Sequence, residues 1–201
     1  MSTFQVLGDP HLGRTFINGV PLHRRGDRER LMWADFTASL MSASFDFHIC
    51  MGDLFDKAVV PYDVITETAR LYKLAAAKAP LTRFIILRGN HDTSRDIERV
   101  SAFDLFSMIV EGTSSIIPVT KPSEIGPYQF YPWSPFGYHI IPSECDAAFG
   151  HWDIESFGGD DHNLIPTKLL QTKRAYTGHI HAAQQFERDG ITVNVVGSMQ
   201  P

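Results

Sequence analysis

Residues 84–92, Phe-Ile-Ile-Leu-Arg-Gly-Asn-His-Asp, place an apolar run before a turn that carries an amide, an imidazole and a carboxylate. The same arrangement, a strand-like run followed by glycine and then by Asp, Asn or His, occurs five times. The five segments are Gly8-Asp9-Pro10-His11, Gly52-Asp53, Gly89-Asn90-His91-Asp92, Gly150-His151 and Gly178-His179-Ile180-His181. Parallel strands bring the residues at their carboxyl ends to one edge of a sheet, where α/β proteins bind ligands. One such loop carries little information, but five predict a two-metal hydrolytic centre.

The ligand types narrow the choice of metal. Carboxylate, amide oxygen and imidazole suit Mn, Fe, Zn or Mg, and the five segments contain no cysteine. Two ions about 3.5–4 Å apart need a bridging carboxylate, for which Asp53 is the natural candidate. Asp9 and His11 could face one ion, while Asn90 supplies a neutral oxygen to the other. The two ligand sets are completed by His151, His179 and His181.

Three further polar residues adjoin these ligands. We expect His91 to protonate the leaving oxygen or to hold the phosphate rather than to bind a metal. Asp56 and Asp92 are expected to lie behind the ligands, where they orient His91 and the nearby loops.

The pattern D-x-H, GD, GNH[DE], GH and GHxH resembles that of the calcineurin-like metallophosphoesterase family, and every position of it is filled here. This resemblance implies an α/β fold of four layers, α/β/β/α, in which two mixed β-sheets are flanked by helices. It also implies two divalent ions. The first would be bound by Asp9, His11, Asp53 and His181, and the second by Asp53, Asn90, His151 and His179.

A narrower resemblance is to SbcD-type DNA nucleases and the related recombination endonuclease subunit of large tailed phages. It is carried by residues 9–13, 52–56, 131–133 and 150–157. It implies a Mn-dependent endo- or exonuclease that acts on DNA in repair or phage recombination. That group continues into a DNA-capping domain and helices that bind a coiled-coil ABC-type ATPase. Residues 1–201 lack both regions, so we expect a single catalytic domain, which could form a homodimer. The alternative is a piece of a longer protein, whose full length could bind such an ATPase subunit.

The charge distribution bears on the substrate. A formal net charge of −5 disfavours a general polyanion binder, although bound metal ions would neutralise several of the carboxylates. A local basic stretch could line a groove for DNA and contains Arg14, Arg24, Arg25 and Arg28. A solvated loop and helix start is the equally open alternative.

Composition and patterning indicate one soluble domain. No apolar run approaches the roughly 20 residues of a membrane span, and the chain starts without a leader-like pattern. We therefore expect a cytoplasmic protein of a bacterium or a phage-infected host cell. Cys50 and Cys145 are interpreted as buried free thiols.

Strands and helices alternate in the first half, which predicts a largely parallel sheet with helices near 27–42, 62–78 and 97–110. Leu31 and Met108 are expected on the packed faces of the first and third helices. The second half contains short strands typical of hairpins, including one at 138–141, and Asp189-Gly190 is a hairpin turn signal. Trp133 and Trp152 could stack on a base or belong to the core.

Two other functions remain open on the sequence. One is a small-molecule phosphodiesterase or phosphatase, which the missing capping domain favours. The other is a phosphoesterase fold kept as a non-catalytic scaffold, which the complete ligand set disfavours.

Overall fold

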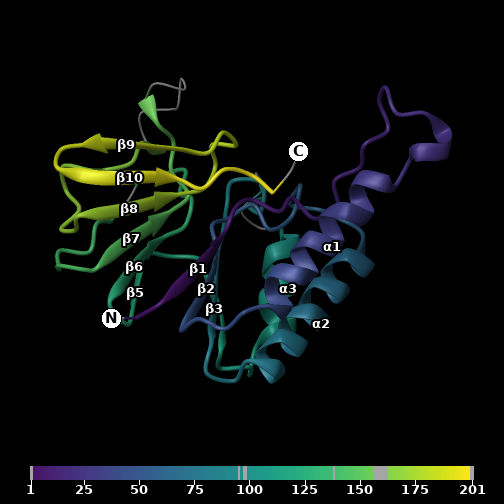
Figure 1. Ribbon diagram of the computed structural model, residues 1–201, viewed down its shortest axis with the longest axis horizontal. Helices are drawn as coiled ribbons and strands as arrows, with labels where there is room; N and C mark the ends of the chain where they lie inside the picture. Colours follow the sequence, from purple (N-terminus) through teal and green to yellow (C-terminus); the bar gives the residue numbers. More distant parts are fainter. Residues whose placement is uncertain (1, 95, 97–98, 138, 156–162, 200–201) are drawn as a thin grey trace.

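The computed structural model describes residues 2–94, 96, 99–137, 139–155 and 163–199. The first half forms a four-stranded sheet in which every neighbouring pair is parallel. Its strands, in spatial order, are β1 (Phe4–Leu7), β2 (Phe47–Cys50), β3 (Arg83–Leu87) and β4 (Ile116–Val119). Figure 1 shows one face of this sheet covered by α1 (Asp27–Met41), α2 (Tyr62–Lys78) and α3 (Ala102–Val110). The expected parallel sheet with crossover helices is confirmed.

The second half forms a six-stranded mixed sheet in the order β5-β6-β7-β8-β10-β9. Its strands are β5 (Ser123–Ile125), β6 (Tyr128–Tyr131), β7 (Ala147–Gly150), β8 (Arg174–Thr177), β9 (Gln184–Arg188) and β10 (Ile191–Val195). Hairpins occur only at its two ends among the described strands, because β6, β7, β8 and β10 pair in parallel. The expectation that hairpins dominate this half is therefore wrong. The Asp189-Gly190 turn is confirmed, with φ of 50° and 77° at its two residues.

The two sheets pack face to face through an aromatic core. Phe149 of β7 stacks on Phe130 of β6 and Tyr176 of β8, with ring centroids 5.3 and 5.0 Å apart. From the other sheet, Phe4 meets the edges of Phe149, Tyr176 and Tyr128. Burying so many apolar rings fixes the position of one sheet against the other.

Side chains alternate between the faces of each sheet, as strand geometry requires. In β3, Ile85 and Leu87 face the second sheet, whereas Phe84 and Ile86 pack against the helices. Both faces of this strand are thus buried, which explains the continuous apolar run from Phe84 to Leu87.

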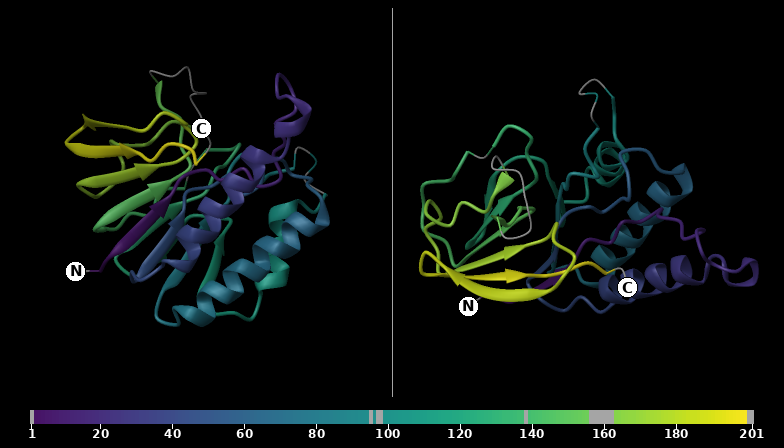
Figure 2. Two further views of the ribbon diagram at one scale, coloured as in Figure 1. Left: turned by 45° about the vertical axis from the view of Figure 1, so that its right-hand side comes forward. Right: turned by 90° about the horizontal axis from the view of Figure 1, so that it is seen from above.

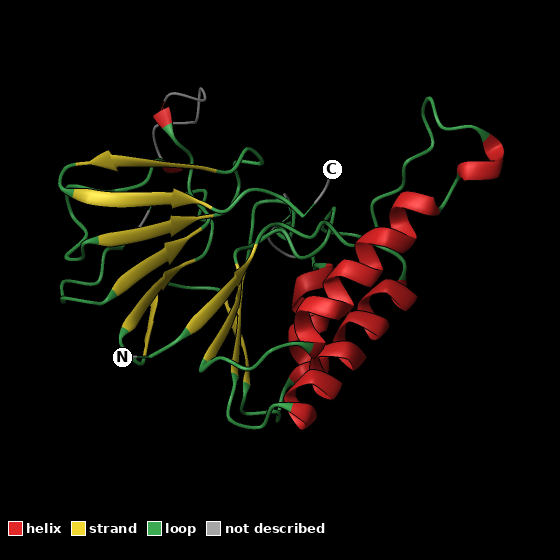
Figure 3. Ribbon diagram, viewed as in Figure 1, coloured by secondary structure: helices red, strands yellow, loops and turns green. Residues whose placement is uncertain are grey.

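The two-sheet α/β sandwich is confirmed, but within the described residues long helices cover only the first sheet. Both rotated views in Figure 2, and the red helices in Figure 3, place the three long helices beside the first sheet. On the outer face of the second sheet, the described residues contribute loop side chains, among them Ile140, Ile165 and Leu170, in place of a helix layer.

The third helix is confirmed with a different start, and one expected strand is wrong. The third helix begins at Ala102 instead of near residue 97, because Ser101 and Asp104 form a capping box that starts it there; residues 97 and 98 lie outside the described part. Residues 139–141 form no strand, and residue 138 is not described. The backbone N–H of Ile141 donates instead to the hydroxyl of Tyr131, at 3.3 Å.

Several predictions about burial also need correction. Leu31 is 63% exposed and Met108 is 59% exposed, so neither belongs to the packed face of its helix. Trp152 is fully buried and belongs to the core, which excludes it from stacking on a base. Cys50 is buried and Cys145 is half-buried, and both are free thiols.

A 3₁₀ turn, η1 (Leu22–Arg24), interrupts the long connection from β1 to α1. Figure 1 shows this connection projecting beyond the first turn of α1. Within the described residues, no helix combines the length and apolar character that crossing a membrane would require.

Candidate metal centre

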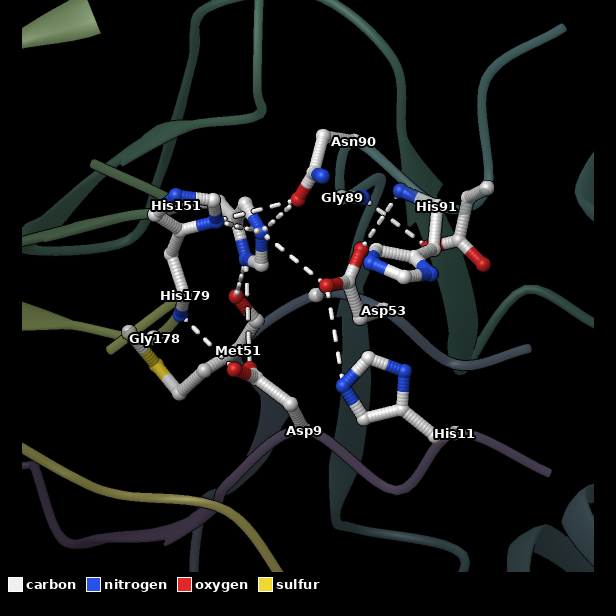
Figure 4. Close-up of polar contacts among 12 residues, drawn as sticks. Asp9, His11, Met51, Asp53, Gly89, Asn90, His91, His151, Gly178 and His179 are labelled. Carbon is white, nitrogen blue, oxygen red and sulfur yellow. Dashed lines mark hydrogen bonds and ion pairs between the residues drawn. The ribbon is translucent and has the colours of Figure 1, made fainter. Parts of the chain in front are cut away.

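The five predicted loops converge where the two sheets meet at the carboxyl ends of their strands. Residues 9 and 11 follow β1, residue 53 follows β2, and residues 90–92 follow β3. The second sheet contributes residue 151 after β7 and residues 179 and 181 after β8. Figure 4 shows Asp53 between the rings of His11 and His91 on one side and those of His151 and His179 on the other. The convergence expected from the sequence is therefore observed.

Three of these residues have left-handed backbones, which non-glycine residues rarely adopt. The φ angles are 46° for His11, 45° for Asp53 and 68° for His179. Such a conformation costs about 1–3 kcal/mol and persists only where the surroundings hold it. In this case each of the three residues lies a few residues after a strand, and its side chain lies among those of the centre.

Glycines line the centre because it leaves no room for another carbon. A Cβ atom at Gly89 would lie 2.1 Å from Oδ1 of Asp53 and 2.2 Å from its backbone nitrogen. A Cβ atom at Gly52 would lie 2.2 Å from Nδ1 of His151. These close approaches explain why glycine precedes the ligands in the sequence motifs.

The first group of potential ligands is Asp9, His11 and His181, whose ligand atoms all lie within 4.8 Å of one another. The Nε2 atoms of the two histidines are 3.2 Å apart. Oδ2 of Asp9 accepts a hydrogen bond from the backbone N–H of His179 at 2.7 Å, which leaves Oδ1 for another partner. Oδ1 is buried and accepts no hydrogen bond in the described part of the chain.

The second group contains Asp53, His151 and His179, again with ligand atoms within 4.8 Å of one another. Oδ1 of Asn90 lies 2.9 Å from Nε2 of His151 and 3.0 Å from Nδ1 of His179. Asp53 also reaches the first group, since its Oδ2 is 3.8 Å from Nε2 of His11 and 3.5 Å from Nε2 of His151. It therefore lies within reach of both groups, and its role as a metal bridge stays a prediction.

The backbone determines which nitrogen of His151 is available. Nδ1 of His151 lies 3.0 Å from the carbonyl oxygen of Met51, which can only accept a hydrogen bond, so Nδ1 carries the proton. In the neutral ring, Nε2 then has a lone pair directed at the amide oxygen of Asn90. Two lone pairs at 2.9 Å repel each other unless a cation or a proton lies beside them.

Burial and crowding shift the pKa values of these groups in opposite directions. Burial, reinforced by Asp53, raises the pKa of Asp9 to about 7. Burial also lowers the pKa of His11 to about 4. Burial disfavours the charged form of His151, but the nearby Asp53 and Asp9 outweigh it and raise its pKa to about 10. Burial likewise opposes ionisation of Asp53, yet the charge of His151 holds its pKa well below its ordinary value.

The donor set fits divalent cations. Carboxylate, amide and imidazole donors are gathered at hydrogen-bonding distances, with one carboxylate oxygen of Asp9 buried and unsatisfied within the described residues. A divalent ion would satisfy that oxygen, and it would take the place of the second proton that the raised pKa of His151 otherwise keeps between Nε2 of that ring and Asn90.

His91 is held at the edge of the centre. Its backbone N–H donates to Oδ1 of Asp53 at 2.8 Å, and its Nδ1 lies 2.6 Å from the carbonyl oxygen of Asp56. The proton is therefore on Nδ1, which leaves Nε2 for substrate. The ring also lies within 4.8 Å of the potential ligand atoms of His11 and Asp53, so it stands beside the first group.

The two supporting aspartates act in different ways. Asp56 holds His91 through its backbone carbonyl, while its carboxylate lies 3.9 Å from Nδ1 of His11. The buried carboxylate of Asp92 accepts hydrogen bonds from the backbone N–H groups of Leu54, Phe55 and Gly89. Asp92 thus ties the loops after β2 and β3 together, and its bonds in the described residues go to backbone amides and not to the ring of His91.

Asp153 is a residue of the centre that the sequence motifs did not indicate. Its Oδ1 lies 2.7 Å from Nε2 of His179, and its Oδ2 accepts a hydrogen bond from the side chain of Asn163 at 2.9 Å. The only signal in the sequence was its position two residues after His151.

The predicted basic residues lie on the projecting connection, which we call the basic arm (residues 14–30). Arg14 is nearest to the centre, with its Nε 3.9 Å from the carboxylate of Asp56. Arg14 and Arg28 each lie over the ring of Phe16, with guanidinium carbons 5.5 and 5.4 Å from its centroid. The arm therefore begins next to the centre and gathers two cationic groups at one aromatic ring.

The other arginines of the arm are exposed, and some of their charge is compensated. Asp27 pairs with both Arg24 and Arg30, whereas Arg25 is exposed next to them. The two acidic residues of the arm, Asp27 and Glu29, reduce its positive charge without removing it.

A cavity of about 650 Å³ opens beside Asn90. Its wall includes Arg88 and the half-buried Trp133, with the strongly exposed Phe136 at its rim. Trp133 therefore remains available to a bound ligand, in contrast to Trp152.

Residues 3–183 of the chain match the calcineurin-like phosphoesterase family. No curated protein sequence matches significantly. Among solved structures, the phosphopantetheinyl hydrolase of Mycobacterium tuberculosis is similar, with a TM-score of 0.52 and 13% identity over 98% of this chain and 89% of that chain. At this identity the similarity shows the shared fold alone. Since the family match spans nearly the whole chain and its motifs meet in one centre, the protein belongs to the calcineurin-like phosphoesterases and is a metal-dependent phosphoester hydrolase.

Proposed function

We propose that the chain is a two-metal phosphodiesterase that cleaves DNA, as SbcD-type nucleases do. The observation that carries the proposal is the placement of Asp53 between two groups of potential ligands. The first ion would be held by Asp9, His11, Asp53 and His181, and the second by Asp53, Asn90, His151 and His179. Mn is the metal we propose, and Fe, Zn and Mg suit the same donors. Such a pair, when bound, supplies positive charge that polarises the phosphoryl group and activates water for in-line attack.

His91 supplies the proton chemistry. The carbonyl of Asp56 fixes its Nδ1, so Nε2 is the atom that meets the substrate. Protonated at Nε2, the ring can donate to the leaving oxygen, a role typically worth about 10²–10⁴-fold in rate. The hydrogen bond from the backbone N–H of His91 to Asp53 holds His91 next to the proposed bridging carboxylate.

The basic arm supports DNA as the substrate. It begins next to the centre and carries Arg14 and Arg28 around Phe16, an arrangement that could contact successive phosphates of a strand. Each phosphate contact releases condensed counterions, so binding through the arm should weaken as salt rises.

The test compares two triple variants in a filter-binding or fluorescence assay over a range of salt concentrations. Changing three arginines of the arm to glutamine (Arg24, Arg25 and Arg28) should flatten the salt dependence by about 0.9 per lost contact on a log–log plot. The matched control removes three exposed cations away from the metal-centre end of the sheet (Arg70, Lys73 and Arg83). DNA affinity that falls equally in both triples would contradict the role of the arm.

A small-molecule phosphodiester is the second candidate substrate, favoured by the cavity beside Asn90. Its volume of about 650 Å³ lies within the usual range for small-ligand sites. The similar structure from Mycobacterium tuberculosis is a phosphopantetheinyl hydrolase, which fits this alternative. Incubation with Mn and single- or double-stranded DNA, beside bis(p-nitrophenyl) phosphate, separates the candidates. Hydrolysis of the small diester without cleavage of any DNA would establish the second, and hydrolysis of neither would favour a scaffold.

A further inference from the structure

We propose that Asp153 and Asn163 form a brace that selects the nitrogen with which His179 binds the second ion. This inference rests on the proposed metal centre. It gives a positioning role to two residues outside the family motifs.

The first step is the contact between Asp153 and His179. Oδ1 of the carboxylate lies 2.7 Å from Nε2 of the ring, and a carboxylate accepts hydrogen bonds when ionised. The proton of the neutral ring is therefore on Nε2. Its other nitrogen, Nδ1, has the lone pair and lies 3.0 Å from the amide oxygen of Asn90. A metal-binding histidine commonly donates its second N–H in this way.

The second step is the anchoring of Asp153 itself. The fully buried Asn163 donates from its side-chain nitrogen to Oδ2 of Asp153 at 2.9 Å and to the carbonyl of His151 at 3.4 Å. The backbones also pair, since the N–H of Asp153 donates to the carbonyl of Asn163 at 3.0 Å. One asparagine thus holds both the carboxylate behind His179 and the backbone of His151. The brace supports two ligands of the same ion.

The third step is what happens when the carboxylate is lost. With Asp153 absent, His179 can move its proton to Nδ1 and donate it to the amide oxygen of Asn90, which is already at hydrogen-bonding distance. That tautomer has no lone pair on the nitrogen that faces the ion. Loss of such a partner typically costs about 10–100-fold in metal affinity. The first ion should be spared, because its proposed ligand set does not include His179.

The experiment is a calorimetric titration of Mn into the metal-free protein and its Asp153→Asn variant. We expect two binding events in the original protein, with the second weakened about 10–100-fold and the first unchanged in Asp153→Asn. Glu155→Gln is the matched control: it removes a carboxylate two residues away that pairs with Arg188 at 2.9 Å on the surface. This control should bind both ions as the original protein does.

A double variant separates positioning from folding. In Asp153→Asn an oxygen directed at His179 would place the new amide nitrogen against that of Asn163, two donors in conflict, so the amide should turn its oxygen to Asn163 and its nitrogen to His179. Adding Asn163→Asp restores an acceptor there, which turns the oxygen of the new asparagine back toward His179 and should recover part of the second affinity. In the metal-free proteins, ¹⁵N spectra of the ring of His179 should show the proton on Nε2 in the original protein and in the double variant. In Asp153→Asn they should show a mixture of the Nε2–H and Nδ1–H tautomers.

The outcomes are distinguishable. Unchanged affinity for both ions in Asp153→Asn, or equal weakening of both with no recovery in the double variant, would overturn the brace. A protein that binds no divalent ion in its original form would refute the proposed metal centre instead.

Discussion

The change Gly89→Ala tests whether the position of Asp53 controls the centre. The added Cβ would lie 2.1 Å from Oδ1 and 2.2 Å from the backbone nitrogen of Asp53. Because a backbone atom is hit as well as the carboxylate, rotation of the side chain alone cannot relieve the contact. The loops after β2 and β3 must separate by roughly 1 Å to restore an ordinary contact, and a displacement of this size can cost about 10²-fold in rate. The overpacking itself should destabilise the fold by about 1–3 kcal/mol.

The assay measures metal content by elemental analysis, turnover of bis(p-nitrophenyl) phosphate, and the free energy of unfolding. We expect reduced occupancy and a rate lower by about 10²-fold. Gly112→Ala is the control, since a Cβ there meets nothing within 4 Å; it has φ of 86°, so it should lose some stability but keep its rate. A Gly89→Ala protein with two ions and a normal rate would refute the reasoning.

Three other changes address single roles. Asp53→Asn removes the charge shared by both groups of ligands, so metal occupancy and turnover should both collapse, and elemental analysis with two ions still bound would contradict the bridge. His91→Ala should keep both ions and lose about 10²–10⁴-fold in rate, whereas loss of metal would make His91 a ligand. In the metal-free protein, Asp53 and Asp9 overcome the burial of His151 and raise its pKa from 6.5 to about 10. The charged ring therefore adds its full contribution to the stability of the folded protein below pH 6.5, and this contribution is lost as the pH rises to about 10. The melting temperature should fall over that pH range, and it should fall less in His151→Gln.

The convergence of the candidate ligands could be predicted because their signal is local. Each is within a few residues of a strand whose apolar run is visible in the sequence, and parallel pairing then brings the loops together. The helices Asp27–Met41 and Tyr62–Lys78 were predictable for the same reason, since the apolar residues that each buries recur at short intervals along the sequence.

Features that depend on distant contacts were not predictable. Asp153 acquires its role from His179, which is 26 residues away in sequence, and Asn163 reaches it where the backbone N–H of Asp153 donates to the carbonyl of Asn163. The edge strand Ser123–Ile125 is short and polar, so it had no apolar alternation to reveal it. Residues 139–141 have a strand-like composition but pack as a loop, because the hydroxyl of Tyr131 takes the place of a neighbouring strand.

The location of the centre links the fold to the chemistry. In the proposed ligand sets, each ion takes side chains from both sheets: His181 joins Asp9 and His11 at the first, and His151 and His179 join Asn90 at the second. The distance between the two sheets therefore sets the geometry of both ions, and that distance is fixed where Phe4 of the first sheet packs edge-on against the rings of the second. The same core that stabilises the sandwich thus positions the candidate ligands. The left-handed backbones of His11, Asp53 and His179 then set the directions of their side chains. Metal binding would in turn cross-link the sheets, so that the folded state and the loaded centre support each other.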